Sequence, residues 1–430
     1  MSRRQHPPLL LGATTLDITP PAGHPMDGYA GRLGPATGTA DPLRATLVWL
    51  STEDDSGVLW LSLDAVATTT ELATELAEAA ATATGIPAER VLVCASHTHS
   101  GPSGWSGRIH PVMTAEREPD LVRALTTTVA TAEIARIPVT ASWRSTEVRG
   151  VGTNRHHLDG PHDATVGILA LTDQAGTTAA VLVDFACHPT AYGAENLLWS
   201  ADWPGAARDR LDSPVVGFLQ GAAGDVSPRF TRQGRDAAEI GRLGGLLATA
   251  VNDALAEGGI PLPSIAPTVR RTTIRLPVRE LPSPEEVSAM VDAAEAAVRS
   301  GDGPAARIAR TRLEGARGQA AMLAADLPAE LVVPITVVSL GHVAWIHLPV
   351  EPFAIHGRRL QDGSEYGVTR VIGYTDGYFG YLVDAEARRT GTYEALISYF
   401  DPAATDRLLA AATTLSIRAP SHDVSTDLIE

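Results

Sequence analysis

One pattern recurs along the chain. An apolar run typical of a β-strand is followed by a polar turn with reactive side chains, and then by an amphipathic segment typical of a helix. The clearest copy has a strand at 58–64, a helix at Thr70–Thr84 and a further strand before His97. Helices that alternate with strands in this way return the chain to the same sheet. We therefore predict an α/β fold in which mixed β-sheets are flanked by helices.

Two further copies of the pattern support this fold class. The second has strands at 178–185 and 215–219, with a helix beginning near Pro204 between them. The third contains Gly341-His342 between two apolar runs, which predicts a tight β-hairpin.

The segment 283–327 differs in composition from the rest. It is rich in alanine, glutamate and arginine at helical spacing, and prolines bound it on both sides. We expect a helical hairpin insertion, with helices at Pro284–Ser300 and Pro304–Ala325, packed on the main body. No other segment reads as a linker, so we predict a single domain over residues 1–430, with a polar tail at 419–430.

Charge and hydropathy narrow the range of partners. The 34 lysines and arginines face 50 acidic residues, for a formal charge of −16, which disfavours binding to nucleic acid. No apolar stretch approaches the roughly 20 residues that span a bilayer, so we expect no stable membrane insertion. The N-terminal apolar stretch is too weak for a secretory signal, and both cysteines lie in apolar runs. These features favour a cytoplasmic protein; they do not predict its oligomeric state.

Two histidines one residue apart, His97 and His99, directly follow an apolar run. If that run continues as a strand up to Gly101-Pro102, the two imidazoles share one face and meet the same cavity. This placement indicates metal chemistry, although two hydrogen-bonded loop histidines are the alternative.

Other reactive side chains also fall at predicted strand ends. His188 ends a second strand, Glu351 a third, and Tyr378 and Tyr381 follow a fourth. Ligands of open α/β sheets bind beyond such ends, so we expect these side chains to gather in one crevice. A set of two histidines and a glutamate suits Zn2+, which lowers the pKa of water to about 7, and Tyr381 could add an oxygen ligand. A buried, backbone-bonded His188 and a helix-terminal Glu351 are the alternatives.

A run of small residues from Gly221 to Gly224 leads through Asp225 to Ser227. Small residues let the backbone approach a ligand and expose amide donors. Ser227 is either a participant in the reaction or a turn serine that caps backbone groups, and the local sequence is not the G-x-S-x-G elbow of serine hydrolases.

Together these motifs resemble the catalytic N-terminal domain of the neutral/alkaline non-lysosomal ceramidases, zinc amidases that cleave the N-acyl bond of ceramide. The matching segments run in order along nearly the whole chain: 17–21, 26–30, 41–43, 96–102, 154–155, 187–189, 200–205, 224–228, 349–351, 378–381 and 393–394.

The resemblance implies roles for individual residues. The zinc ligands would be His97, His188, Glu351 and Tyr381. The residues around the scissile amide would be His99, Arg155 and Tyr393. Ser227 would have a supporting role in contact with the substrate. We further expect Gly224, Asp225 and Tyr378 to bind substrate.

The chain also departs from the family's pattern. The family's C-terminal immunoglobulin-like domain has no expected counterpart, since the sequence printed ends at Glu430, soon after the last motif. Arg229 stands where ceramidases usually have a small amide side chain. Fold and metal are therefore expected to carry over better than substrate.

We accordingly predict a zinc-dependent hydrolase that cleaves a linear amide bond with metal-activated water. Its substrate would be a small-molecule or lipid-like amide, either ceramide or a smaller, more polar N-acyl compound. A zinc enzyme acting on an ester, a lactone or another carbonyl compound is the first alternative. A non-catalytic binding protein on the same fold is the second.

Overall fold

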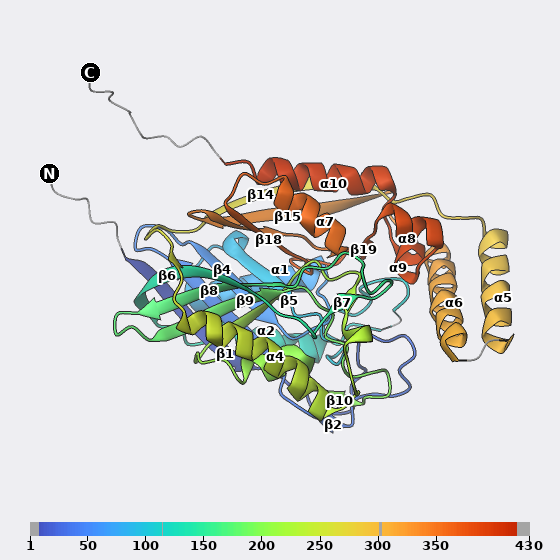
Figure 1. Cartoon of the computed structure of the whole chain (residues 1–430), viewed down its shortest axis with the longest axis horizontal. Coiled ribbons are helices and arrows are strands. Elements are labelled where there is room, and N and C mark those ends of the chain that lie inside the picture. Colours follow the sequence, from blue (N-terminus) through green and yellow to red (C-terminus); the bar gives the residue numbers. More distant parts are fainter. Residues whose placement is uncertain (1–7, 114, 301–302, 419–430) are drawn as a thin grey trace, which may run out of the picture.

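The computed structural model describes residues 8–113, 115–300 and 303–418; the expected tail at 419–430 lies outside them (Figure 1). It confirms an α/β fold with mixed sheets and flanking helices. The long sheet has the strand order β11-β9-β8-β6-β1-β3-β4-β5. Its strands are β1 (Leu9–Asp17), β3 (Arg44–Ser51), β4 (Val58–Leu63), β5 (Val91–Ala95), β6 (Arg136–Glu147), β8 (Thr165–Asp173), β9 (Thr178–Phe185) and β11 (Val216–Gln220).

The pairing within this sheet explains why it is mixed. β4 pairs in parallel with β5, and β9 in parallel with β11, whereas β1, β6 and β8 pair antiparallel with their neighbours. A parallel pair needs a crossover, and helix α1 (Thr70–Thr84) supplies it between β4 and β5. The Thr69 side chain caps its start and Gly85, at φ 77°, ends it, so the predicted helix is confirmed.

A second sheet has the order β14-β15-β16-β18 and contains the predicted hairpin at Gly341. Its strands are β14 (Thr268–Pro277), β15 (Glu330–Leu340), β16 (Val343–His347) and β18 (Val368–Ile372). Trp60 of the long sheet and Trp345 of the second sheet are both buried, and their rings meet edge to face at 5.8 Å. One apolar cluster thus draws on both sheets, and for this reason we propose that the chain forms a single domain.

Helices cover the outer faces of the two sheets. Helix α4 (Ala237–Ala256) contacts β6 and β8 of the long sheet, and α10 (Pro402–Leu415) contacts β14 and β15 of the second (Figure 1). Helices α2 (Pro119–Ala130), α3 (Asp202–Arg208) and α7 (Ala354–Asp362) pack against α1, α4 and α10 respectively. Among the described residues, no helix is both long and apolar enough to cross a membrane.

The expected helical hairpin is present as α5 (Pro284–Ser300) and α6 (Gly303–Ala324), at one end of the molecule (Figure 1). Helix α6 lies against the short helix α9 (Tyr393–Ile397). A Cβ atom on Gly315 would lie 2.7 Å from Leu396 Cδ1, and one on Gly318 would lie 2.6 Å from Ile397 Cγ2. Two glycines therefore allow the close approach of the hairpin to α9.

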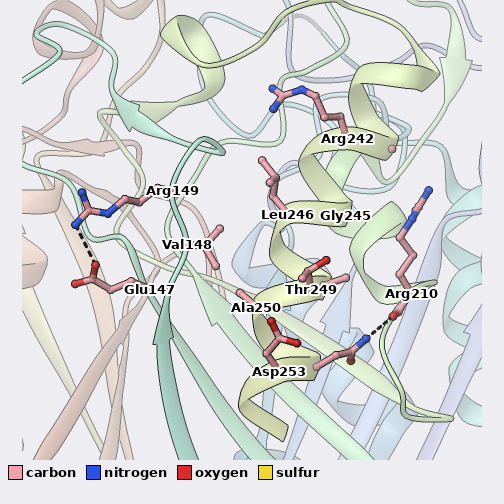
Figure 2. A pocket seen from close by; sticks show the side chains of 13 residues that line it. Glu147, Val148, Arg149, Arg210, Arg242, Gly245, Leu246, Thr249, Ala250 and Asp253 are labelled. Atoms are coloured by element: carbon pink, nitrogen blue, oxygen red, sulfur yellow. Dashed lines mark hydrogen bonds and ion pairs between the residues drawn. The ribbon is translucent and has the colours of Figure 1, made fainter. Parts of the chain in front are cut away.

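A surface cleft of about 660 Å³ lies between α4 and the segment Glu147–Arg149 (Figure 2). Its wall carries Arg149, Arg210 and Arg242, and Arg149 forms an ion pair with Glu147 at 3.2 Å. No histidine or cysteine is among the described residues that line it, so it offers none of the side chains that the sequence marks as reactive.

Candidate metal centre

The chain turns sharply at His97. Strand β5 ends at Ala95, and His97 has φ 67°, a left-handed conformation that is rare for residues other than glycine. The expectation of an extended segment up to Gly101-Pro102 is therefore wrong. The backbone N–H of His97 donates to the Ala65 carbonyl at 2.9 Å, so a contact outside the strand imposes the turn. Positive φ held by its surroundings is typical of functional sites.

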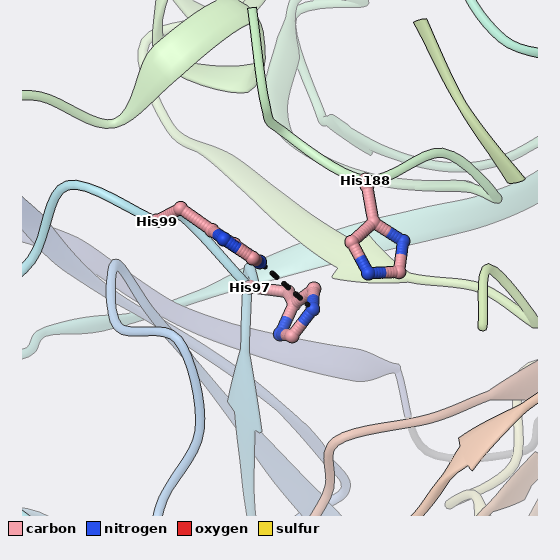
Figure 3. A group of neighbouring side chains, drawn as sticks. All are labelled: His97, His99 and His188. Atoms are coloured by element: carbon pink, nitrogen blue, oxygen red, sulfur yellow. Dashed lines mark hydrogen bonds between the residues drawn. The ribbon is translucent and has the colours of Figure 1, made fainter. Parts of the chain in front are cut away.

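The two imidazoles nevertheless converge as predicted. The Nε2 atoms of His97 and His99 lie 3.3 Å apart (Figure 3). His99 packs on Gly28, where a Cβ atom would lie 2.5 Å from the His99 Cβ and where φ is +95°. Only glycine fits both the space and the conformation at position 28.

His188 follows β9 and reaches the same place (Figure 3). Its Nδ1 lies 2.8 Å from the Ala223 carbonyl oxygen, and the Nδ1 of His97 lies 2.6 Å from that of Val66. A carbonyl can only accept, so both Nδ1 atoms carry the proton and both Nε2 atoms are unprotonated acceptors. The Nδ1 atom of His188 is thus bonded to the backbone, and its Nε2 atom faces the other histidines. This is the usual arrangement of a metal-binding histidine.

The carboxylate of Glu351 lies between the histidines. Its Oε2 is 3.3 Å from the Nε2 of His97 and 3.3 Å from the Nε2 of His188. Two phenols hold the same carboxylate, since Tyr378 donates to Oε1 at 2.5 Å and Tyr374 donates to Oε2 at 3.3 Å. The predicted Tyr378 therefore contacts Glu351, and Tyr374 is a partner that the sequence did not suggest.

Tyr381 is placed next to Glu351 by strand pairing. The short strands β17 (Glu351–Pro352) and β19 (Tyr381–Leu382) pair in parallel with these two residues opposite each other. The Tyr381 hydroxyl accepts from Arg155 Nη2 at 3.4 Å, and Arg155 Nη1 lies 3.2 Å from His188 Nε2. Arg155 is in turn fixed by Glu394, whose Oε1 is 2.5 Å from Nη2.

Electrostatics favour neutral imidazoles and charged partners around them. Burial, together with the neighbouring His97 and His188, holds the pKa of His99 well below its usual value, and burial with the nearby Arg155 lowers the pKa of His188 to about 4. Burial opposes ionisation of Glu394, but Arg155 outweighs it and lowers the pKa of that carboxyl. His99 and His188 are therefore neutral near pH 7, the form that binds a metal ion.

These side chains could hold a metal ion. Nitrogen atoms of His97, His99 and His188 all lie within 4.8 Å of one another, and two of these residues are buried. Imidazole nitrogen and carboxylate oxygen suit zinc, and Glu351 supplies the oxygen beside two of the nitrogens. His99 lies as close to this cluster as the expected ligands, although the sequence assigned it to the substrate.

A cavity of about 260 Å³ opens onto the cluster. Most of the expected site residues line it: His97, His99, Arg155, Glu351, Tyr378, Tyr381 and Tyr393. Tyr393 is the first residue of α9 and lies edge to face with Tyr381, at 6.3 Å between ring centroids.

Three expected substrate contacts, Gly224, Asp225 and Ser227, are not among the residues that line this cavity. The Asp225 carboxylate accepts from the Ala354 backbone at 2.7 Å and from Asn154 Nδ2 at 2.7 Å, and Ser227 Oγ accepts from the Arg229 backbone at 3.3 Å. A Cβ atom on Gly224 would lie 2.7 Å from the Glu351 carbonyl oxygen. In this structure the segment braces Arg155, His188 and Glu351; its contact with substrate stays a prediction.

Sequence reasoning assigned no role to Gly28, Tyr374 and Glu394. Gly28 and Glu394 lie within the matched segments 26–30 and 393–394, and Tyr374 directly follows the apolar run 369–373, so their position was the available signal. The contacts that give them roles join segments far apart in the chain, as in the Arg155–Glu394 pair.

The fold and the side-chain cluster define a protein with a candidate metal centre at the strand ends of a mixed α/β structure. The family model for the neutral/alkaline non-lysosomal ceramidases, N-terminal region, matches residues 9–239, more than half of the chain. The chain therefore belongs to this family of hydrolases, and the resemblance seen in the sequence is confirmed.

Solved structures agree on the fold. Neutral ceramidase from Pseudomonas aeruginosa superposes with a TM-score of 0.75 at 18% identity, over 98% of this chain and 77% of that one. A ceramidase complexed with C2 superposes with a TM-score of 0.73 at 17% identity, over 98% and 77% of the respective chains. No curated protein sequence matches the chain.

Proposed function

We propose that this protein is a zinc-dependent hydrolase that cleaves a linear N-acyl amide bond. The observation that carries the proposal is the position of Glu351, whose Oε2 lies 3.3 Å from the unprotonated Nε2 of both His97 and His188. Buried carboxylates and imidazoles are costly to assemble unless they serve a charged ligand or a reaction.

The residues that would hold zinc are His97, His188, Glu351 and Tyr381. When bound, zinc supplies Lewis-acid chemistry, which polarises a carbonyl group and makes water acidic enough to react near neutral pH. The backbone carbonyls on the Nδ1 atoms fix the orientation of both imidazoles, and Tyr374 and Tyr378 fix that of the carboxylate.

The chain's own donors would act on the amide. The carbonyl oxygen of an amide becomes negative as water adds to its carbon, and Arg155 and Tyr393 both line the cavity where this charge develops. The Glu394 carboxylate holds Arg155 in place, so its donors need little reorganisation during the reaction. His99 is neutral and its Nδ1 is buried without a partner among the described residues, so it can accept a hydrogen bond from the substrate.

We propose a small-molecule or lipid-like amide as substrate, because the structural relative in complex carries C2 and because the cavity at the cluster is compact, at about 260 Å³. We also propose a cytoplasmic location, since Cys94 and Cys187 are both free and buried rather than joined in a disulfide.

The test combines metal analysis with a matched substrate pair. Protein purified and dialysed against trace zinc should hold about one zinc per chain, and it should hydrolyse an N-acyl amide faster than the matched ester relative to their rates in buffer. The His97→Ala variant should lose both zinc and turnover while its circular dichroism spectrum stays unchanged. An active, metal-free protein would rule out the zinc mechanism, and selective ester hydrolysis would replace the amide by the ester. A zinc-loaded protein that cleaves neither would favour the binding-protein alternative.

A further inference from the structure

A second pocket, of about 440 Å³, adjoins the cavity at the metal centre. Arg155, Arg229, Tyr393 and Glu394 line both spaces, so the two are contiguous. We call the cavity at the histidines the inner cavity and the space beyond Arg155 the outer pocket. The outer pocket lies between the turn at Arg229 and helix α6, which carries Arg312.

The wall of the outer pocket carries more positive than negative charge. Arg155, Arg229 and Arg312 line it, whereas Glu394 is its only acidic residue among the described part of the chain. Glu394 pairs with Arg155, and the wall carries two further guanidinium groups, those of Arg229 and Arg312. The formal charge of the whole chain is −16, and a local reversal of this kind attracts anions.

The two guanidinium groups face the pocket from different elements. Arg229 follows Ser227 in the short 3-10 helix Pro228–Phe230, and its Nη1 donates to the Arg155 carbonyl at 3.0 Å. Arg312 lies on α6, and no acidic side chain of the described residues forms an ion pair with it. Planar guanidinium groups recognise carboxylates through paired hydrogen bonds, which ammonium groups do not provide.

Apolar side chains stand beside these charges. Phe230 and Ile308 line the outer pocket and are 47% and 58% exposed, respectively. The inner cavity differs because Glu314 and Glu351 also line it, so the side chains of its wall carry more negative charge than those of the outer pocket. An anion on the substrate is therefore favoured in the outer pocket, with the amide bond toward the histidines.

We propose that the outer pocket binds a carboxylate of the substrate, and that the preferred substrates are N-acyl amides with a carboxylate near the amide, such as N-acyl amino acids. The inference rests on the proposed amide hydrolysis. Water adds across the C–N bond, the bond breaks, the acyl group leaves as a carboxylic acid, and the nitrogen takes up a proton in an amine that keeps its own carboxylate. Arg229 and Arg312 are binding residues in this account.

The experiment compares an N-acylglycine with its carboxamide, which has the same acyl chain and the same scissile amide but no charge. We expect kcat/KM to be about tenfold higher for the acid, mainly through a lower KM, because one exposed charge-assisted contact contributes up to about fivefold and the pocket offers two. The preference should fall as salt is raised. Hydrolysis of an N-acylaminomethyl phosphonate is measured beside that of the acid. The comparison distinguishes recognition of a carboxylate from a general attraction of anions.

Two substitutions locate the effect. In Arg312→Gln and in Arg229→Gln, the ratio of kcat/KM for acid over carboxamide should fall several-fold, by more in the double variant, with unchanged zinc content. Arg149→Gln, in the distant cleft of Figure 2, is the matched control and should keep the full ratio.

The outcomes separate the two proposals. Equal or faster hydrolysis of the carboxamide, or a ratio that neither substitution changes, would overturn the carboxylate pocket and leave amide hydrolysis standing. A stronger preference for the phosphonate would replace the carboxylate by another anion. Hydrolysis of neither amide by the zinc-loaded protein would overturn the proposed function itself.

Discussion

The inner cavity and the outer pocket adjoin each other but are built differently. At the inner cavity His97 and Glu351 line the wall and His188 lies beside them; all three are buried, and each is held by further hydrogen bonds. In the outer pocket Arg229 and Arg312 are exposed, on a short turn and on the helical hairpin. Buried, mutually fixed groups suit chemistry, whereas exposed groups suit recognition, so we expect the first region to set the reaction and the second to set the substrate.

The largest effect should come from the carboxylate of the inner cavity. Glu351→Gln keeps the size of the side chain but removes the charge between two imidazoles. We expect zinc affinity to fall at least about 100-fold, with turnover lost in proportion. Competition with a fluorescent zinc chelator measures the affinity. Glu147→Gln, in the cleft of Figure 2, is the control, and equal affinities in the two variants would contradict the ligand role.

The next effect should come from the pair that joins the two regions. Glu394→Gln leaves the buried guanidinium of Arg155 without its counter-charge. Removing one partner of such a pair costs about 3 to 5 kcal/mol of unfolding free energy. Denaturant unfolding measures this cost, and kcat should fall because Arg155 is no longer held.

An exposed pair provides the comparison for Glu394. Glu195 and Arg235 meet at 3.5 Å with side chains 62% and 48% exposed, so Glu195→Gln should cost less than about 1 kcal/mol. Similar costs for the two glutamates would show that burial of Arg155 does not matter.

A smaller effect is expected at Gly28, beneath His99. Alanine there meets the His99 Cβ at 2.5 Å, whereas alanine at Gly23, with φ +106°, meets nothing within 4 Å. Both variants carry the backbone strain of about 1 to 2 kcal/mol, but only Gly28→Ala displaces a histidine. We therefore expect kcat to fall in Gly28→Ala alone. A matching loss in Gly23→Ala would assign the effect to backbone strain.

The smallest effect should arise where the hairpin meets α9. Gly318→Ala places a methyl group 2.6 Å from Ile397 and should destabilise the chain by about 1 kcal/mol while weakening the substrate preference of the outer pocket. Gly245→Ala, in α4 with nothing within 4 Å, should raise the melting temperature because alanine favours helix by up to about 1 kcal/mol. The same sign of shift in both variants would mean that packing against α9 is not tight.

Local pattern predicted the elements that bring the site together. Helix α1 has the predicted bounds Thr70–Thr84, and strand β9 matches the apolar run at 178–185, because periodicity and caps are local signals. Strands β1, β6 and β8 were not predicted. The pairing of β1 with β6 joins distant segments, as between Leu9 and Val139, and such a register has no local signature. Strand β8 pairs with the adjacent β9, as between Thr172 and Thr178, but its apolar run was not identified as a strand.

In the site, too, some features had a local signal in the sequence and others depend on contacts between distant segments. His97, His188, Glu351 and Tyr381 could be proposed from their positions at strand ends, and the structure brings them together. The left-handed turn at His97 could not be predicted, since it is held by hydrogen bonds from the His97 backbone N–H to the Ala65 carbonyl and from the His97 imidazole to the Val66 carbonyl.

The central claim is that distant side chains share one metal ion, and anomalous diffraction at the zinc edge tests it most directly. A crystal grown with zinc should show one strong peak at about 2.1 Å from the Nε2 atoms of His97 and His188, and at a similar distance from a Glu351 oxygen. A peak located elsewhere, or an active enzyme in crystals without any peak at these residues, would contradict the account.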